Sequence, residues 1–241
     1  MQFVRVIQLG EKIRDTLRHE GFLIVLWRVL VKFLSPVGSV GMATLYEKDL
    51  TRPIVEVNAK VDVTVTEAAG SDIVRVVELM AWHAYGSAEA VAETDKGVQE
   101  LLGRGARCFV AKIGDEIVHY NWLAFQWAES LPISSGGRFI VLENDEAFCM
   151  NAYTVPPWRG RAIHTAVLHT MLLWLRRAGV RKAYTVVSND NKSSWKTHER
   201  LGWGVRGTML YFKRRGKDGA WVWGTRGILR RFVAEEIPRR S

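Results

Sequence analysis

The segment from Tyr153 to Trp203 constrains the fold most, because four elements with clear boundaries follow one another in it. It opens with a turn that contains two prolines, and a helix without glycine or proline follows the turn. The N–H groups at a helix start have no partner inside the helix, and the helix dipole makes that end positive. Arg159 and Arg161 add positive charge there. The segment therefore predicts a site for phosphate groups.

Composition favours a folded protein with acidic partners. The chain has 241 residues, of which 48% are hydrophobic, and this is enough to bury a core. The formal charge of +9 is concentrated near the two ends of the chain. Such an excess suits the phosphates of a cofactor, an anionic membrane surface or nucleic acid, although a solvated face or tail explains it equally well. Nucleic acid is the least favoured partner, because neither basic segment is clearly interleaved with aromatic residues.

The two cysteines argue against a disulfide framework and against a metal site. Cys108 and Cys149 lie in separate strand-like runs and have no spacing typical of metal ligands. We therefore expect no bound metal and a reducing compartment. The first 17 residues carry mixed charges and no small-residue cleavage pattern, so we expect the protein to be cytoplasmic.

An apolar run near the start predicts an amphipathic helix. Residues 22–34 form this run, but it is short and contains Arg28 and Lys32, so it should not cross a bilayer. Two interpretations stay open. The helix could pack on the main domain or on a second copy of the chain, which would make a homodimer, or it could lie at a membrane surface.

Breaks in the pattern divide the chain into four parts. We expect an N-terminal helical arm at residues 1–45, a linker at 46–60, one domain at 61–225 and a basic tail at 226–241. Within the domain, a strand and two helices precede several strands, and then a helix, a strand, a helix and further strands follow. This order predicts an α+β (mixed α/β) fold in which helices cover a mostly antiparallel sheet.

Two separate motifs then give a resemblance to a known family. Pro156, Arg159 and Gly160 match V-x-P-x-x-R-G-x-G-x-G, while Asn191, Ser194 and Gly202 match N-x-x-[AS]-x-x-x-Y-x-x-x-G-[FY]. With these motifs in the right order, residues 61–223 resemble the GNAT superfamily of N-acetyltransferases. The chain departs from the pattern in five places. Thr154 replaces a valine, Ala162 and His164 replace glycines, His198 replaces a tyrosine, and Trp203 is the closing aromatic in place of Phe or Tyr.

The resemblance implies that acetyl-CoA, or another acyl-CoA, binds where the fourth and fifth strands of the sheet splay apart. The pantetheine arm would pair with the backbone of Thr154 and Val155, and Asn191 would lie beside it, together with Ser194 of the same motif. The pyrophosphate would contact backbone N–H groups of one continuous run: Arg159, Gly160, Arg161, Ala162, Ile163, His164 and Thr165. The His164 ring could point away along the helix or could donate to a phosphate.

The resemblance also implies catalytic roles. The N–H of Ala152 would stabilise the oxyanion, and Glu146 is the leading candidate for the base, although a salt bridge at the strand edge explains this glutamate as well. Tyr153 and His119 are further candidates for the base. His198 takes the place of a tyrosine that donates a proton to the sulfur of coenzyme A, and it could act in the same way or be a spectator.

We therefore expect an acyl-CoA-dependent N-acyltransferase, most simply an N-acetyltransferase, that acts on a small amine such as an amino sugar or an amino acid derivative. Two alternatives remain. One is a longer-chain acyltransferase near a membrane that uses acyl-CoA or acyl carrier protein, and the other is a non-catalytic binding protein with the same fold.

Overall fold

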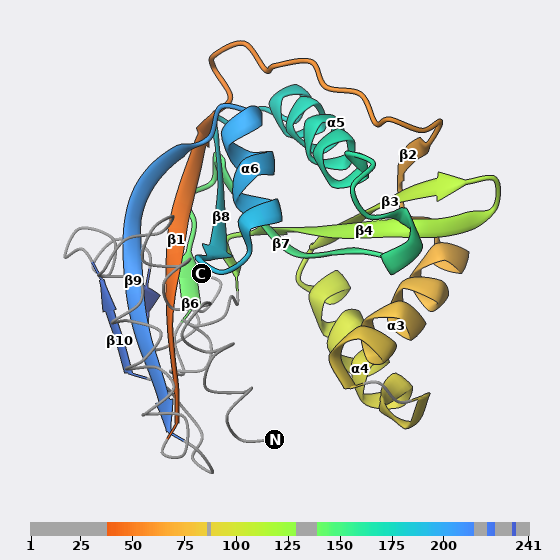
Figure 1. Ribbon diagram of the computed structural model, residues 1–241, viewed down its shortest axis with the longest axis horizontal. Coiled ribbons are helices and arrows are strands. Elements are labelled where there is room, and N and C mark those ends of the chain that lie inside the picture. The colour runs from red at the N-terminus through yellow and green to blue at the C-terminus, as the bar shows by residue number, and fades with distance from the viewer. Residues whose placement is uncertain (1–37, 86–87, 129–138, 215–220, 225–232, 235–241) are drawn as a thin grey trace, which may run out of the picture.

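The computed structural model describes residues 38–85, 88–128, 139–214, 221–224 and 233–234. Its main sheet has eight strands: β1 (Gly38–Asp49), β2 (Thr64–Glu67), β3 (Arg107–Ile113), β4 (Glu116–Phe125), β7 (Glu146–Thr154), β8 (Lys182–Ser188), β9 (Gly204–Arg214) and β10 (Trp221–Gly224). Their order in the sheet is β10-β9-β1-β8-β7-β4-β3-β2 (Figure 1). Only the β7–β8 pair is parallel. The predicted mixed α/β fold with a mostly antiparallel sheet is confirmed.

Helices cover both faces of this sheet. They are α3 (Gly70–Tyr85), α4 (Val91–Gly103), α5 (Ile163–Arg177) and α6 (Lys192–Arg200), with short 3₁₀ turns η1 (Ala88–Ala90) and η3 (Pro156–Trp158). Val76 and Val98 of α3 and α4 are buried in one hydrophobic cluster with Trp122. Leu168 of α5 and Leu201 at the end of α6 belong to the cluster on the other side. The two clusters make the sheet the centre of the molecule, with a pair of helices on each face.

The sheet splays open between β7 and β8, as the sequence predicts. The two strands pair only from Glu146 to Phe148 on β7 and from Lys182 to Tyr184 on β8. Beyond this point β7 carries a bulge, because its register with β4 shifts between Tyr120 and Trp122. The bulge leaves Asn151 and Ala152 without a paired residue, and Asn151 has a positive φ of 50°. This irregularity turns the end of β7 away from β8 and opens a V-shaped gap.

Strand β1 is an unexpected element. The sequence predicts a helical arm up to residue 45 and a linker from residue 46, but residues 38–49 form a strand between β8 and β9. This part of the prediction is wrong. Gly41 leaves room for the Tyr211 ring of the neighbouring strand, because a Cβ there would lie 2.3 Å from the end of this ring. Residues 1–37, which include the predicted amphipathic helix, lie outside the described residues.

Residues 50–63, which we call the strap, cross the outside of α5 on their way from β1 to β2 (Figure 1). From Val57 to Val63 the side chains alternate between half-buried and exposed, as in a strand that packs on one face. Val57, Ala59, Val61 and Val63 pack against the core on the α5 side. The Lys60 N–H donates a hydrogen bond to the Arg161 carbonyl at 2.8 Å. The strap thus holds the turn that precedes α5.

A second, smaller sheet joins β5 (Trp127–Ala128), β6 (Phe139–Val141) and β11 (Val233–Ala234) in the order β11-β6-β5. Residues 233–234 pair with Ile140 and Phe139, although they belong to the segment that the sequence predicts as a tail. The rest of that segment lies outside the described residues. None of the described helices has the length and apolar character needed to cross a membrane.

Candidate active site

The turn before α5 has the geometry of an anion-binding loop. Gly160 and Ala162 both have left-handed backbone angles, with φ of 77° and 58°. Ala162 is the N-cap residue of α5, and no side chain caps this helix end. The first N–H groups of α5, from Ile163 to Thr165, therefore have no partner within the helix. Ala162 keeps the conformation that a glycine would adopt here, so its substitution leaves the loop intact.

The two arginines of this loop point to different places. The guanidinium of Arg161 lies 5.0 Å from the Trp158 ring. The Arg159 Nε donates a hydrogen bond to the Thr154 carbonyl at 3.0 Å, and its guanidinium lies 5.5 Å from the Tyr153 ring. Arg159 therefore folds back onto the end of β7, while its backbone stays in the loop.

The bulge in β7 exposes backbone at the open end of the V. Asn151 and Ala152 are exposed, and neither has a paired residue on β4 or β8. Asn121 of β4 lies opposite this bulge and is only 1% exposed, and its Oδ1 has no hydrogen-bond partner within the part of the chain that the structure describes. A buried amide oxygen without a donor is costly and suits a ligand that brings an N–H group. The sequence analysis missed Asn121, since nothing in the local pattern marks it.

Glu146 lies at the closed end of the V. Its residue is 2% exposed and is paired with Lys182 at the start of the parallel segment. Tyr184 Oη donates a hydrogen bond to its Oε1 at 2.9 Å, and the Glu143 N–H donates to its Oε2 at 3.1 Å. Both carboxylate oxygens accept hydrogen bonds that join β7, β8 and the preceding turn. This geometry favours a structural role over that of a base.

A row of three histidines lies beneath the start of α5. His119 Nδ1 is 2.8 Å from Thr154 Oγ1, and His119 Nε2 is 3.4 Å from His164 Nδ1. The His164 and His198 ring centroids are 5.9 Å apart. The half-buried His164 side chain therefore turns inward to the other two rings and does not run along the outside of the helix. We call His119, His164 and His198 the histidine row.

Burial keeps the histidine row neutral at pH 7. It lowers the pKa of His119 to about 3 and that of His198 to about 4. The pKa of His164 is also well below its usual value, first because of burial and then because of His119 and His198. A charged imidazole would lose its hydration here and would repel its neighbours. At neutral pH each ring of the row is therefore uncharged and is a weaker base than a free imidazole.

His198 is enclosed by aromatic rings from distant parts of the chain. Its ring stacks on Tyr46 of β1 with a centroid distance of 5.7 Å and meets Trp203 edge-on at 5.1 Å. Its Nδ1 is 2.7 Å from the Ser194 carbonyl, so Nδ1 carries the proton of the neutral ring. Nε2 is then an acceptor. In this state the ring cannot donate through Nε2, as the proton-donor role would require.

Asn191 and Ser194 together begin α6. Asn191 is the N-cap, and its Oδ1 accepts a hydrogen bond from the Ser194 N–H at 3.1 Å. Ser194 also provides the carbonyl that holds His198. The second motif of the sequence thus builds the helix start and orients the histidine.

The opposite face of the sheet carries a second cluster, which the sequence analysis missed in part. The His83 ring of α3 lies 4.1 Å from the Tyr153 ring, and the Tyr120 ring lies 5.9 Å from it. His83 ends a helix that reads as an ordinary amphipathic segment, so no local signal identifies it. Trp122 of β4, on the same face, is fully buried. The side chain of Trp127 lies outside the described residues.

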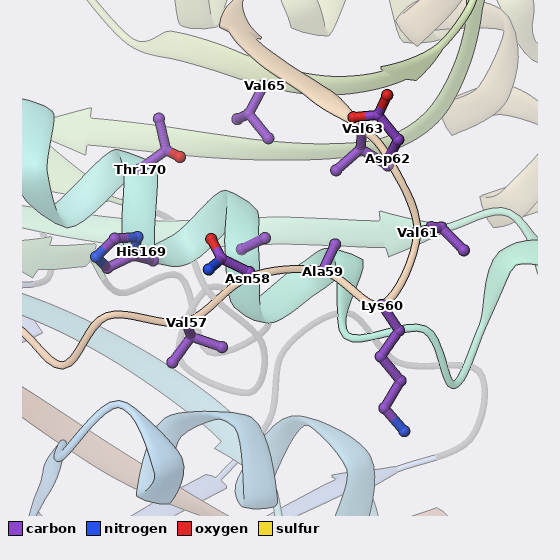
Figure 2. Close-up of a pocket in the computed structure, with 11 residues that line it drawn as sticks. Val57, Asn58, Ala59, Lys60, Val61, Asp62, Val63, Val65, His169 and Thr170 are labelled. Carbon is purple, nitrogen blue, oxygen red and sulfur yellow. The ribbon is translucent and has the colours of Figure 1, made fainter.

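A cavity of about 590 Å³ lies elsewhere, between the strap and the outer side of α5 (Figure 2). Val57, Asn58, His169 and Thr170 are among its lining residues, and Lys60 extends away from it. None of the side chains of the histidine row lines it. The gap between β7 and β8 is therefore the candidate active site, because the helix start, the bulge and the histidine row meet there.

The model of the acetyltransferase (GNAT) family matches residues 76–203, which is more than half of the chain. The chain belongs to this family. The match starts inside α3 and ends just after α6, so β1, the strap and β2 lie outside it. It includes both motifs, the histidine row and the second cluster. The search of curated proteins finds no significant match.

Solved structures support the GNAT fold. A GNAT-family acetyltransferase from Colwellia psychrerythraea is 13% identical with a TM-score of 0.52, and the match covers 74% of this chain and 58% of that one. A GCN5-related N-acetyltransferase from Sphaerobacter thermophilus is 15% identical with a TM-score of 0.52, at 79% and 56% coverage. A tandem GNAT protein from the clavulanic acid biosynthesis pathway is 17% identical with a TM-score of 0.50, at 77% and 58% coverage. The chain spans less than two thirds of the length of each.

Proposed function

We propose that this protein transfers an acyl group, most simply acetyl, from acyl-CoA to the nitrogen of a small amine. The observation that carries the proposal is the open V between β7 and β8, with an uncapped helix start on one side and unpaired backbone on the other. Bound acyl-CoA would supply a thioester, which is an activated acyl donor.

The residues present fit this co-substrate. The N–H groups from Ile163 to Thr165 form the start of α5, and a helix start binds anions. The exposed Arg161 adds positive charge there for a pyrophosphate. The backbone of Thr154 and Val155 would pair with the pantetheine arm. The buried Asn121 Oδ1 at the bulge offers an acceptor to an amide N–H of that arm. The left-handed Ala162 and Gly160 keep the loop open for close approach of phosphate oxygens.

The exposed bulge provides the catalytic donor. We propose that the Ala152 N–H donates to the carbonyl oxygen that becomes negative during acyl transfer, a contribution for which the side chain is irrelevant. The bulge fixes this N–H before the substrates arrive. Proximity of amine and thioester in the V lowers the barrier further.

His198 is the candidate for the residue that gives a proton to the leaving sulfur. Its ring is neutral, so Nε2 would take the proton that the attacking nitrogen loses and pass it to the leaving sulfur. His164 and His119, which are also neutral, extend the path of acceptors toward Thr154. Under this proposal His198→Phe lowers turnover, and unchanged turnover at every pH would remove His198 from the mechanism.

One experiment tests the function as a whole. Thiol release from acetyl-CoA and from longer acyl-CoA is measured against a panel of amines, together with the melting temperature of the protein in each acyl-CoA. A co-substrate that binds only the folded state must raise this temperature. If no acyl-CoA raises it, the acyltransferase proposal fails and a non-catalytic role is favoured. A preference for long acyl chains would select the longer-chain alternative.

A further inference from the structure

The cluster on the α3 face of the sheet joins three groups that the proposed mechanism does not use. The rings of His83 and Tyr153 are 4.1 Å apart, and the guanidinium of Arg159 lies 5.5 Å from the same Tyr153 ring. His83 comes from α3, Tyr153 from β7, and Arg159 from the loop that follows η3. The two side chains that approach Tyr153 are both exposed, while Tyr153 is half-buried between them.

This cluster borders the open V from the side opposite the histidine row. Tyr153 directly follows Ala152, whose N–H is proposed to contact the reacting carbonyl. Successive side chains of a strand point to opposite faces, so Tyr153 faces α3 while Thr154 faces α5 and contacts His119. Under the proposed function, the loop before α5 would hold acyl-CoA on the α5 side, and the amine would then approach the carbonyl from the α3 side, where this cluster lies.

The charge at this approach is positive. Arg159 uses its Nε for the Thr154 carbonyl, and none of the ion pairs found among the described residues involves its guanidinium. An arginine without a carboxylate partner binds carboxylate or phosphate groups well, because its planar group offers several donors.

We propose that the acceptor is a small amine that also carries a carboxylate or a phosphate, that Arg159 binds this anion, and that His83 takes the proton from the amine. This inference rests on the proposed acyltransferase function and names its substrate class.

The reaction balances with these groups. His83 accepts one proton from the substrate ammonium, and the free amine then attacks the thioester carbonyl. A C–N bond forms, the C–S bond breaks, and the second proton of the nitrogen goes to the leaving sulfur. His83 afterwards releases its proton to solvent. Partial burial, and then the nearby Arg159, lower the pKa of His83, so the imidazole is neutral and ready to accept at pH 7. The Tyr153 phenol also faces it, and the Tyr120 ring lies 5.9 Å from the ring of Tyr153.

Matched amines test the anion. Calorimetric binding and turnover are compared, in the presence of acetyl-CoA, for phenylalanine against phenethylamine and for glucosamine 6-phosphate against glucosamine. We expect the anionic member of one pair to be preferred. A preference for phenylalanine would identify the anion as a carboxylate, and a preference for glucosamine 6-phosphate would identify it as a phosphate. Arg159→Gln should raise KM for this amine about 10- to 100-fold, which corresponds to a charged hydrogen bond.

Arg161→Gln is the matched control, because it lies two positions away in the same loop. It should raise KM for acetyl-CoA and leave KM for the amine unchanged. If Arg159→Gln weakens acetyl-CoA binding instead, or if no anionic amine is preferred over its uncharged partner, the inference is overturned. Failure of the wild-type protein to bind acetyl-CoA would instead contradict the proposed function itself.

A pH profile tests His83. The wild-type kcat/KM should fall as the pH drops below the His83 pKa, and His83→Gln should lower kcat by about 10²- to 10⁴-fold and remove this limb. Added imidazole should restore part of the rate. The exposed Arg75→Gln, elsewhere on α3, serves as the control and should keep both the rate and the limb. A His83→Gln variant with the wild-type profile, or one that imidazole does not rescue, would overturn the assignment.

Discussion

His119 and His164, 45 residues apart in sequence, place Nε2 and Nδ1 of their rings 3.4 Å apart beneath α5. Their pKa values, and that of His198, lie below the unfolded value of about 6.5. As the pH falls below 6.5, the unfolded chain therefore binds protons that the folded chain refuses. Stability that is fully present above pH 6.5 is lost as the pH falls through the folded pKa values, which are about 4 for His198 and about 3 for His119.

This pH dependence gives the first prediction. Urea unfolding at pH 7, 6 and 5 should show a falling free energy of unfolding, with a slope of at most about 1.4 kcal/mol per pH unit from each histidine. His164→Gln removes one member of the row and should reduce the slope. Carboxylates that titrate in the same range act equally on both proteins. Equal slopes would show that the row does not control acid stability.

Lys48 should be important for stability. Its residue is 5% exposed, and its Nζ donates hydrogen bonds to the Leu201 carbonyl at 2.8 Å and to the Gly202 carbonyl at 3.4 Å. Lys48→Met removes this cation from the end of α6 and should lower the free energy of unfolding by about 1.5–3 kcal/mol in urea titrations. Lys196→Met, at an exposed position of the same helix, should change it by no more than about 0.5 kcal/mol. Similar losses in both variants would contradict the buried contact.

Ala162→Gly should make the protein more stable. The positive φ of 58° is unfavourable for a residue with a Cβ, by roughly 1–2 kcal/mol, and the greater freedom of glycine in the unfolded chain offsets part of the gain. We expect a net increase of up to about 1 kcal/mol by thermal unfolding, with an unchanged dissociation constant for acetyl-CoA. Ala166→Gly inside α5 is the control and should be destabilising. A lower melting temperature for Ala162→Gly would refute this interpretation of the loop.

Glu146→Gln should separate stability from activity. Each carboxylate oxygen accepts one hydrogen bond, from Tyr184 or from Glu143. The amide of glutamine has one oxygen that can accept, so its NH₂ group would face the other donor. We therefore expect a loss of about 1–3 kcal/mol of stability and an unchanged kcat. Tyr184→Phe should show the same pattern, since it breaks the same network. A large drop in kcat with intact stability would restore Glu146 as the base.

The two motifs made the centre of the fold predictable from sequence. Pro156 and Gly160 mark the turn before α5, and Asn191 marks the start of α6, because caps and turns depend on residues that are close in sequence. The splay of the sheet was also predicted, although only through the family resemblance. Its physical cause, the bulge at Asn151, leaves no local signal, since asparagine is tolerated at positive φ without being required there.

Contacts between distant segments could not be predicted in the same way. The sequence predicts an arm up to residue 45, yet Gly41 lies in a strand, with the Tyr211 ring against it. His83 contacts Tyr153, and several helices and strands separate these two residues along the chain. The inward turn of His164 likewise depends on His119. Each of these depends on tertiary packing, which residue periodicity does not encode.

The position of β1 in the sheet affects how the chain folds during its synthesis. Residues 38–49 leave the ribosome early, but both of their partners, β8 and β9, belong to the last third of the chain. Until those strands emerge, β1 has no partner in the main sheet, and an unpaired strand can associate with other chains. Most of the residues of the candidate site are therefore synthesised before β1 can take its place between β8 and β9.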